Sequence, residues 1–196
     1  MRYGIDIGHN APPDTGAMSG YEDELNKELG LKVAAGLASL NHNAIIVNPG
    51  TRVWSVGHSL RMRCDNANAE KCDRFVSFHF NAFNTRAFGT EVYYLSQAGY
   101  RMAKPVVDEI CNLKVGRFQM FNRGAKKTSY FQVLNNTNMP AILIETAFCD
   151  NPQDMKTYNA IGSDEVAKAI IRGLTGKDPL SFCSDVSITK KYNVCL

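Results

Sequence analysis

The chain has 196 residues, of which 44% are hydrophobic and 21% are charged, enough apolar sequence for one sizeable core and too little length for two full domains. This composition is not that of a disordered chain, and no apolar run approaches the roughly 18 residues of a membrane-spanning helix, so we expect a soluble globule without membrane insertion. The net charge of +3 is too small to indicate a nucleic-acid partner, although it favours an anionic surface.

Apolar runs and helical periodicity alternate along the chain. Residues 2–7 read as a strand, and a loop at 8–20 separates it from a helix with leucine or valine at positions 25, 29, 33 and 37. The further elements expected are strands at 43–48, 74–79, 90–95 and 140–145 and helices at 55–70, 97–113 and 163–173. Strands that alternate with helices in this way predict an α/β fold: a single domain with a twisted, mostly parallel sheet flanked by helices.

The two ends of the chain differ from this alternating pattern. The first residues contain no apolar segment followed by a small-residue cleavage site, which predicts that no signal peptide is present. Residues 176–196 begin with Gly-Lys-Asp-Pro and show no amphipathic period, so we expect a domain at 1–175 and a tail at 176–196. Cys183 and Cys195 of this tail are the one cysteine pair free enough to bridge, and most of the cysteines are expected to fill the core.

Three apolar strand runs lead directly into a side chain that can bind a metal ion or carry a proton: His9, His79 and Glu145. In open α/β sheets, ligands bind beyond the carboxyl ends of the strands, so we expect these three side chains to converge. Two neutral imidazoles and one carboxylate, with a fourth position left open, form the ligand set of a catalytic zinc ion.

The start of the first helix offers three acids as the missing carboxylate ligand: Glu22, Asp23 and Glu24. At 100° per residue, the apolar stripe of this helix centres on Glu22, whereas the other two acids point away. A buried carboxylate is costly unless it is paired or binds a metal ion, so we predict Glu22 as the ligand and explain the other two by the helix dipole. Asn26, one turn later, is expected to hydrogen-bond to a ligand.

A histidine at a strand end, taken alone, is more often a structural residue than a metal ligand. Two such histidines together with two acids reverse that balance, since a glutamate directly after Ala-Ile-Leu-Ile is expected to be buried and therefore to need a partner. The remaining histidines, His42 and His58, lie in polar stretches and are expected to be solvated.

Six short segments carry a family resemblance, which is weak for each segment alone and strong for all six in this order. They are Ile5-Asp6-Ile7-Gly8-His9-Asn10, Tyr21-Glu22-Asp23-Glu24-Leu25-Asn26-Lys27, Ser77-Phe78-His79-Phe80-Asn81-Ala82, Gly89-Thr90-Glu91-Val92, Asn122-Arg123-Gly124-Ala125-Lys126 and Pro140-Ala141-Ile142-Leu143-Ile144-Glu145-Thr146. Together they resemble the zinc-dependent N-acetylmuramoyl-L-alanine amidases of the amidase-3 type, particularly the catalytic domains of phage endolysins. The resemblance covers residue 1 to about residue 174.

The resemblance implies roles for particular residues of this chain. It implies that one zinc ion is bound by His9, Glu22 and His79, and that Glu145 is the general base. It also implies that the substrate groove is lined by Asn81 and by the loop Asn122-Arg123-Gly124. The family commonly has Gly-His-Gly-Gly at the first ligand, whereas here His9 is followed by Asn10 and Ala11.

The function so implied is zinc-dependent hydrolysis of the amide bond between N-acetylmuramic acid and L-alanine. The expected partner is peptidoglycan, the expected state is a monomer, and the expected location is the bacterial cell wall, reached through a phage holin or an unrecognised export route. The alternatives are a zinc metallopeptidase that cuts within the stem peptide, a non-catalytic wall-binding domain and a cysteine hydrolase. The cysteine hydrolase would use Cys149 or Cys111 as its nucleophile. No sequence motif places a histidine beside either cysteine, and the charge of Asp150 would raise the thiol pKa of Cys149.

Overall fold

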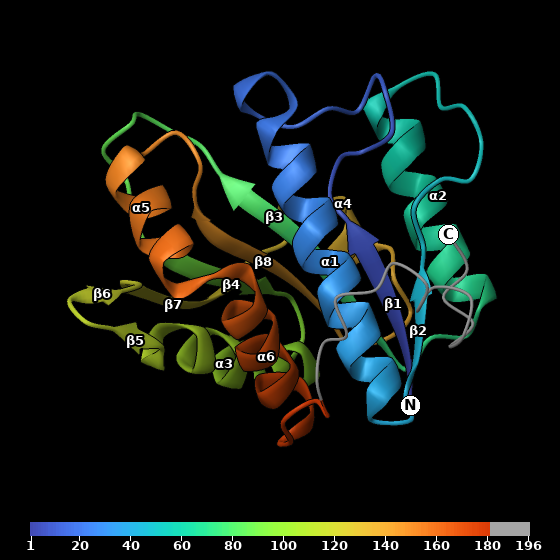
Figure 1. Ribbon diagram of the computed structural model, residues 1–196. Helices are drawn as coiled ribbons and strands as arrows, with labels where there is room; N and C mark the ends of the chain where they lie inside the picture. The colour runs from blue at the N-terminus through green and yellow to red at the C-terminus, as the bar shows by residue number, and fades with distance from the viewer. Residues whose placement is uncertain (181–196) are drawn as a thin grey trace.

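A computed structural model of the chain describes residues 1–180. Its centre is a six-stranded sheet with the strand order β2-β1-β3-β8-β4-β7 (Figure 1). The strands are β1 (Arg2–Ile7), β2 (Asn43–Ile46), β3 (Arg74–Asn81), β4 (Thr90–Tyr94), β7 (Asn122–Lys127) and β8 (Ala141–Phe148), and β5 (Lys114–Val115) pairs with β6 (Phe118–Gln119) in a separate hairpin. In the large sheet only β4 and β8 pair antiparallel, so the predicted mostly parallel α/β sheet is confirmed.

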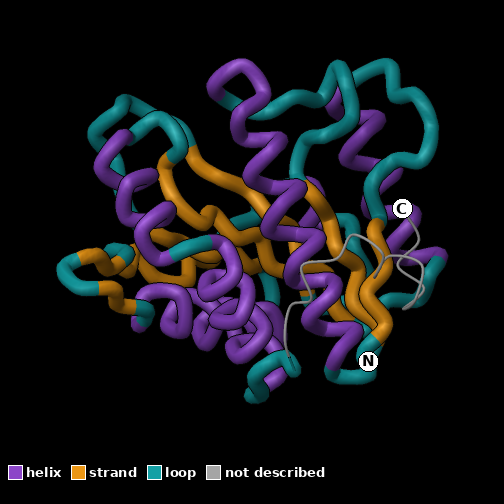
Figure 2. Tube along the Cα trace, in the orientation of Figure 1, coloured by secondary structure: helices purple, strands orange, loops and turns teal. Residues whose placement is uncertain are grey.

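Helices cover both faces of this sheet (Figure 2). They are α1 (Tyr21–Ser39), α2 (Val56–Ala69), α3 (Gln97–Asn112), α4 (Gln132–Asn135), α5 (Pro152–Ile161) and α6 (Ser163–Thr175), with a 3-10 turn, η1 (Met18–Gly20), before α1. The larger core lies between the sheet and α1, α3 and α6, and a smaller core lies on the side of α2 and α4. Burial of both faces explains why the central strands read as continuous apolar runs.

Successive side chains of each strand point to opposite faces of the sheet. On β8, Ile142 and Ile144 enter the larger core, whereas Leu143 enters the smaller one. His79 of β3 and Glu145 of β8 are register partners, and Glu145 follows Leu143 by two residues. His79 and Glu145 therefore lie side by side on the face that α2 and α4 cover.

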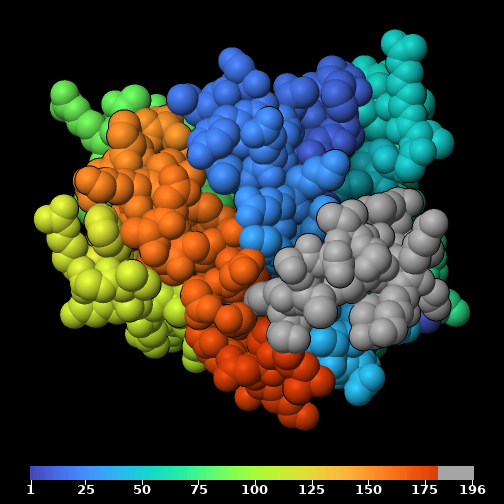
Figure 3. All heavy atoms as spheres, in the orientation of Figure 1, coloured from blue at the N-terminus to red at the C-terminus, as the bar shows by residue number. Residues whose placement is uncertain are grey.

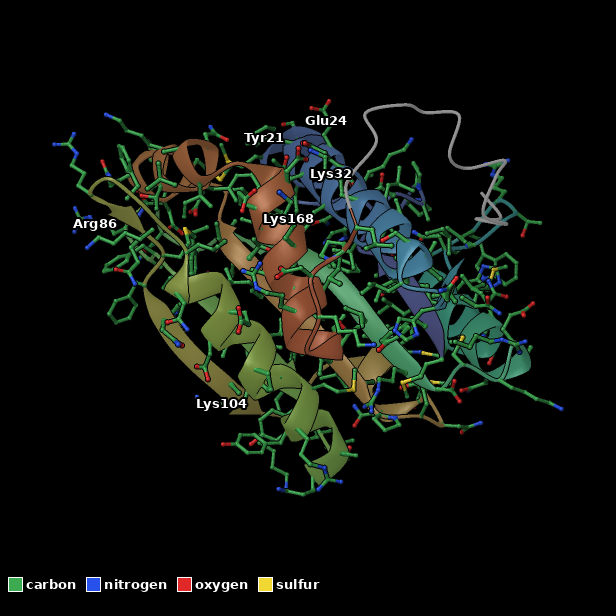
Figure 4. All side chains as sticks on the ribbon, turned by 60° about the horizontal axis from the view of Figure 1, so that its bottom comes forward. Tyr21, Glu24, Lys32, Arg86, Lys104 and Lys168 are labelled. Carbon is green, nitrogen blue, oxygen red and sulfur yellow. The ribbon has the colours of Figure 1, made fainter. Side chains whose placement is uncertain are left out.

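Helix α6 is fixed closely against its neighbours. A Cβ atom on Gly173 would lie 2.6 Å from the Cα of Val106 in α3, so glycine permits the two helices to approach each other. Lys32 of α1 lies beside the start of α6 (Figure 4), where its ammonium group is 2.6 Å from both the Ser163 hydroxyl and the Asp164 carboxylate.

Two strands extend further than the sequence predicts. Strand β3 continues to Asn81 and β8 to Phe148, so His79 and Glu145 lie within strands, whereas the sequence placed them at strand ends. The reason is that the three residues after Glu145 are also buried, and they keep β8 paired with its neighbour up to Phe148.

Some elements are absent from the sequence-based prediction. The predicted loop Asn122-Arg123-Gly124 is instead the start of β7, an edge strand whose polar sequence carries no strand pattern and which is fixed by pairing with β4. Helix α5 was also missed, although Pro152 occupies its first turn and the Asn151 side chain accepts hydrogen bonds from the N–H groups of Gln153 and Asp154.

The structure also bears on the predictions for membrane insertion, the cysteines and the tail. Among residues 1–180, no helix has the length and apolar character needed to cross a bilayer. The four cysteines in this part of the chain are buried and free, as predicted for core residues. The boundary between residues 175 and 176 stays a prediction, and the suggested bridge from Cys183 to Cys195 lies outside the described residues.

Candidate active site

Three residues that are far apart in sequence meet at one end of the sheet. His9, Glu22 and His79 each offer one ligand atom, and these three atoms lie within 4.8 Å of one another. Glu22 Oε1 is 3.3 Å from His9 Nε2 and 3.1 Å from His79 Nδ1. In the described part of the chain, this is the one group of three or more such side chains placed to hold a metal ion.

Two of the spacings between these atoms match those around a tetrahedral ion. Zinc bonds to nitrogen and oxygen of about 2.0–2.1 Å imply ligand atoms about 3.3 Å apart. Both distances to Glu22 Oε1 are close to that value. Two imidazole nitrogens and one carboxylate oxygen are also the donor types of catalytic zinc sites, so the residues present fit the ion.

The backbone around His9 is shaped to direct its ring toward the other two ligands. His9 and Asn10 adopt left-handed conformations with φ of 56° and 57°, an arrangement that is uncommon outside glycine. Gly8 lies against the second histidine, because a Cβ atom there would be 2.4 Å from the His79 ring. Any larger residue at position 8 would displace that ring.

Helix α1 places its acids largely as the periodicity predicts. Glu22 is 4% exposed and Asn26 is fully buried, whereas Glu24 is exposed. The Asn26 amide nitrogen lies 3.2 Å from the Gly8 carbonyl and 3.4 Å from Glu22 Oε1. The prediction for Asp23 is wrong, since its carboxylate accepts a hydrogen bond from the Asn10 N–H at 2.8 Å and holds the loop before the helix, a contact that helical periodicity cannot reveal.

Sequence reasoning missed the residues that hold His9 in place. Asp14 Oδ1 is 2.9 Å from His9 Nδ1, and Asp14 Oδ2 accepts a hydrogen bond from the Ser59 hydroxyl at 2.7 Å. Arg63, 1% exposed, pairs with Asp6 at 2.5 Å and donates to the carbonyl oxygens of Ile7 and His9. The sequence holds one indication of these contacts, because Ser59 and Arg63 are four residues apart and therefore lie on the same, buried side of helix α2.

The carboxylates make this cluster attractive to cations. Burial disfavours the charged form of His9, yet hydrogen bonds to Asp14 and Glu22 outweigh burial and raise the pKa of His9 to about 10. Burial would likewise raise the pKa of Glu22, but hydrogen bonds from His79 and His9 hold that pKa well below its ordinary value. The field that stabilises a proton here would also stabilise a divalent ion.

Glu145 lies in the same cavity as the three candidate ligands, a space of about 410 Å³. It is 9% exposed, and its Oε2 atom has no hydrogen-bond partner. Burial raises its pKa well above the ordinary value, and the negative charges of Glu22 and Glu91 add to this effect. A buried carboxyl group with one free oxygen can accept a proton and return it.

The predicted groove residues are only partly brought together. Asn81 lines the cavity of Glu145, and its amide nitrogen is 3.2 Å from Glu91 Oε1. Arg123 Nε donates to Glu91 Oε2 at 2.6 Å. Asn122 lines a separate cavity with Phe88 and Asp154, while Gly124 pairs in register with Glu91. Sequence reasoning missed Glu91, a buried acid that pairs across the strands with Glu145.

The cysteines suggested for a cysteine hydrolase are poorly suited to that chemistry. Cys111 and Cys149 are both buried. Burial raises the pKa of each thiol to about 12. Because the thiolate is the nucleophile, neither residue is activated at neutral pH.

Comparison with known proteins assigns the sequence that forms this site to a family. The sequence pattern of the amidase-3 group, N-acetylmuramoyl-L-alanine amidase, matches residues 4–176. The chain belongs to this amidase family. The match runs from the first strand to the residue after α6 and so includes all the site residues named above.

Individual relatives resemble this chain at modest identity. The N-acetylmuramoyl-L-alanine amidase LytC of Bacillus subtilis is 30% identical over 173 residues, which cover 86% of this chain and 34% of LytC. The endolysin of Bacillus phage SPP1 is 30% identical over 76% of this chain and 55% of the endolysin. The chain spans about half (52%) of an uncharacterised Clostridium perfringens protein, CPE1502, at 29% identity.

A solved structure shares the fold over nearly its whole length. The catalytic domain of the CD27L endolysin that targets Clostridia difficile superposes with a TM-score of 0.78 at 26% identity, covering 91% of this chain and 98% of that domain. The six-stranded, mostly parallel sheet with flanking helices is therefore a fold that the chain shares with an endolysin catalytic domain.

Proposed function

We propose that this chain hydrolyses the amide bond between N-acetylmuramic acid and L-alanine in peptidoglycan, using one zinc ion held by His9, Glu22 and His79. The observation that carries the proposal is the meeting of these three side chains with Glu145 in one cavity of an amidase-family fold. A non-catalytic wall-binding domain has no use for a buried, unpartnered carboxyl group beside a metal-ligand cluster.

The ligand cluster and Glu145 have separate tasks in this proposal. When bound, zinc supplies Lewis-acid chemistry, which lowers the pKa of the attacking water and polarises the scissile carbonyl. Asp14 keeps the His9 ring oriented through the 2.9 Å contact to Nδ1. Asn26 does the same for the Glu22 carboxylate from the next turn of α1.

Glu145 performs the proton transfers. Its free Oε2 atom accepts a proton from the attacking water, and the protonated carboxyl then gives that proton to the departing nitrogen of L-alanine. Burial and the neighbouring acids raise the pKa of Glu145, which makes its carboxylate a stronger base than an ordinary one. The cavity supports this role because its walls shield Glu145 from bulk water.

Substrate contacts are proposed for Asn81 and Arg123, which converge on the Glu91 carboxylate beside Glu145. Asn122 and Gly124 support this wall from the start of β7, where Asn122 Oδ1 accepts a hydrogen bond from the Gly124 N–H at 2.8 Å.

The proposed site of action is the bacterial cell wall, and the proposed state is a monomer, which sedimentation analysis would report as a single 21.7 kDa species.

A zinc metallopeptidase that cuts within the stem peptide would use the same ligands, so the bond must be identified directly. Purified sacculi are digested with and without a chelator, and the new amino termini are determined by mass spectrometry. The amidase exposes the amino group of L-alanine and leaves muramic acid intact, and the chelator abolishes this release. Amino termini from inner positions of the stem peptide would instead identify the metallopeptidase. Binding to sacculi without any release would identify a wall-binding domain.

A further inference from the structure

A second cavity, which the proposed hydrolysis does not use, lies next to the loop that carries His9. It has a volume of about 580 Å³ and is lined by Pro12, Pro13, Arg52, Val53 and Trp54. The residues after β1 and those before α2 form its two walls, and these segments lie side by side on the molecular surface, in dark blue and teal (Figure 3). Pro12 and Pro13 present an apolar wall without N–H donors.

Trp54 forms a flat aromatic platform in this cavity. Its side chain is 73% exposed, so much of the ring is open to solvent at the mouth of the cavity. One face of the indole is stacked on His58, with ring centroids 3.2 Å apart and an interplanar angle of 14°. The Ser55 side chain accepts a hydrogen bond from the His58 N–H and caps α2, so the platform has a fixed support and one covered face.

The cavity is structurally joined to the candidate active site. Backbone hydrogen bonds of 2.9 and 3.2 Å between Ala11 and Asp14 close the turn that holds Pro12 and Pro13. Asp14 in turn contacts His9 and the hydroxyl of Ser59 in α2. Residues near the start of α2 also line the cavity of Glu145. The second cavity is therefore held in a fixed position beside the loop that carries His9.

We propose that this second cavity is a saccharide subsite, which binds an N-acetylated hexosamine of the glycan strand beside the muramic acid whose amide is cleaved. The inference rests on the proposed function for the identity of the polymer. The C–H face of a pyranose ring packs on an open aromatic face such as that of Trp54. Arg52 offers only hydrogen-bond donors, which match the hydroxyl and N-acetyl carbonyl oxygens of such a sugar.

The test measures sugar binding without turnover. Tetra-N-acetylchitotetraose is titrated into the full chain by calorimetry and by fluorescence, since Trp54 is the only tryptophan in the sequence. We expect saturable binding with a change in indole emission, a loss of affinity of at least about tenfold for Trp54→Ala, and partial retention for Trp54→Phe, which keeps a flat ring. Phe121→Ala is the matched control, because Phe121 is 55% exposed and lines no part of this cavity.

Several outcomes would overturn the subsite: no binding by the folded wild-type chain, binding without a change in emission, equal affinity of Trp54→Ala, or equal affinity for maltotetraose, which lacks N-acetyl groups. Circular dichroism confirms that each variant is folded. Turnover of sacculi is measured in parallel, where Trp54→Ala is expected to raise KM and leave kcat unchanged. If the chain cleaves sacculi but does not bind the chitotetraose, the subsite alone is refuted. If the chain binds the sugar through Trp54 but does not cleave sacculi, the proposed hydrolysis alone is refuted.

Discussion

At the scale of single residues, the orientation of His9 depends on an acid five positions later. Asp14 Oδ1 contacts the ring nitrogen that faces away from the ligand cluster, and such a contact fixes both the tautomer and the direction of a metal-binding imidazole. We predict that Asp14→Ala weakens zinc binding about 10–100-fold, measured by competition with a chromophoric chelator. Asp65→Asn, an exposed acid on α2, should leave the affinity unchanged, and equal affinities for both variants would refute the role of Asp14.

Arg63 has a structural task behind the same loop. Its guanidinium is buried between the carboxylates of Asp6 and Asp14, so its removal leaves Asp6 without a charge partner and leaves Asp14 with His9 alone. Arg63→Met is therefore predicted to lower the free energy of unfolding by about 3–5 kcal/mol, measured by urea denaturation. Arg61→Met, at an exposed position of the same helix, should change it by less than about 0.5 kcal/mol. Similar midpoints for the two variants would contradict the assignment.

At the scale of elements, the contact between α3 and α6 permits a matched comparison of two helical glycines. A Cβ atom on Gly173 would meet the backbone of Val106 at 2.6 Å, whereas a Cβ atom on Gly57 in α2 would meet nothing within 4 Å. Gly173→Ala should cost about 1–3 kcal/mol of stability through overpacking. Gly57→Ala should add about 0.5–1 kcal/mol, because alanine loses less entropy in a helix. Thermal or urea unfolding measures both, and a neutral Gly173→Ala would show that the helices can separate at little cost.

The elements also show what local sequence can predict. Central strands and long helices are visible because burial demands apolar runs or helical stripes, and Glu22 was chosen among three acids on that basis. Strand β7 is polar and is fixed by pairing with β4, so no local pattern reveals it. Asp14, Arg63 and Glu91 were missed for a related reason, since their partners come from other parts of the chain. Arg63 and Asp6, for example, are 57 positions apart.

At the scale of the whole molecule, the fold brings one ligand each from the loop after β1, the first turn of α1 and strand β3, and it adds Glu145 from the neighbouring β8. The sheet therefore serves as a rigid frame in which the ligands and the proton carrier have fixed relative positions. Such pre-organisation limits the freedom that the reacting groups lose during catalysis. It also separates two functions, ion binding and proton transfer, onto different residues that can be removed one at a time.

That separation is tested most directly by measuring zinc content and release of L-alanine amino termini on the same purified samples of wild type, His79→Ala and Glu145→Gln. Wild type should hold one zinc ion per chain and cleave sacculi. Glu145→Gln should keep the ion and lose about 10²–10⁴-fold in rate, whereas His79→Ala should lose the ion together with activity. Cleavage by Glu145→Gln at a near-native rate, or a full complement of zinc in His79→Ala, would contradict the account.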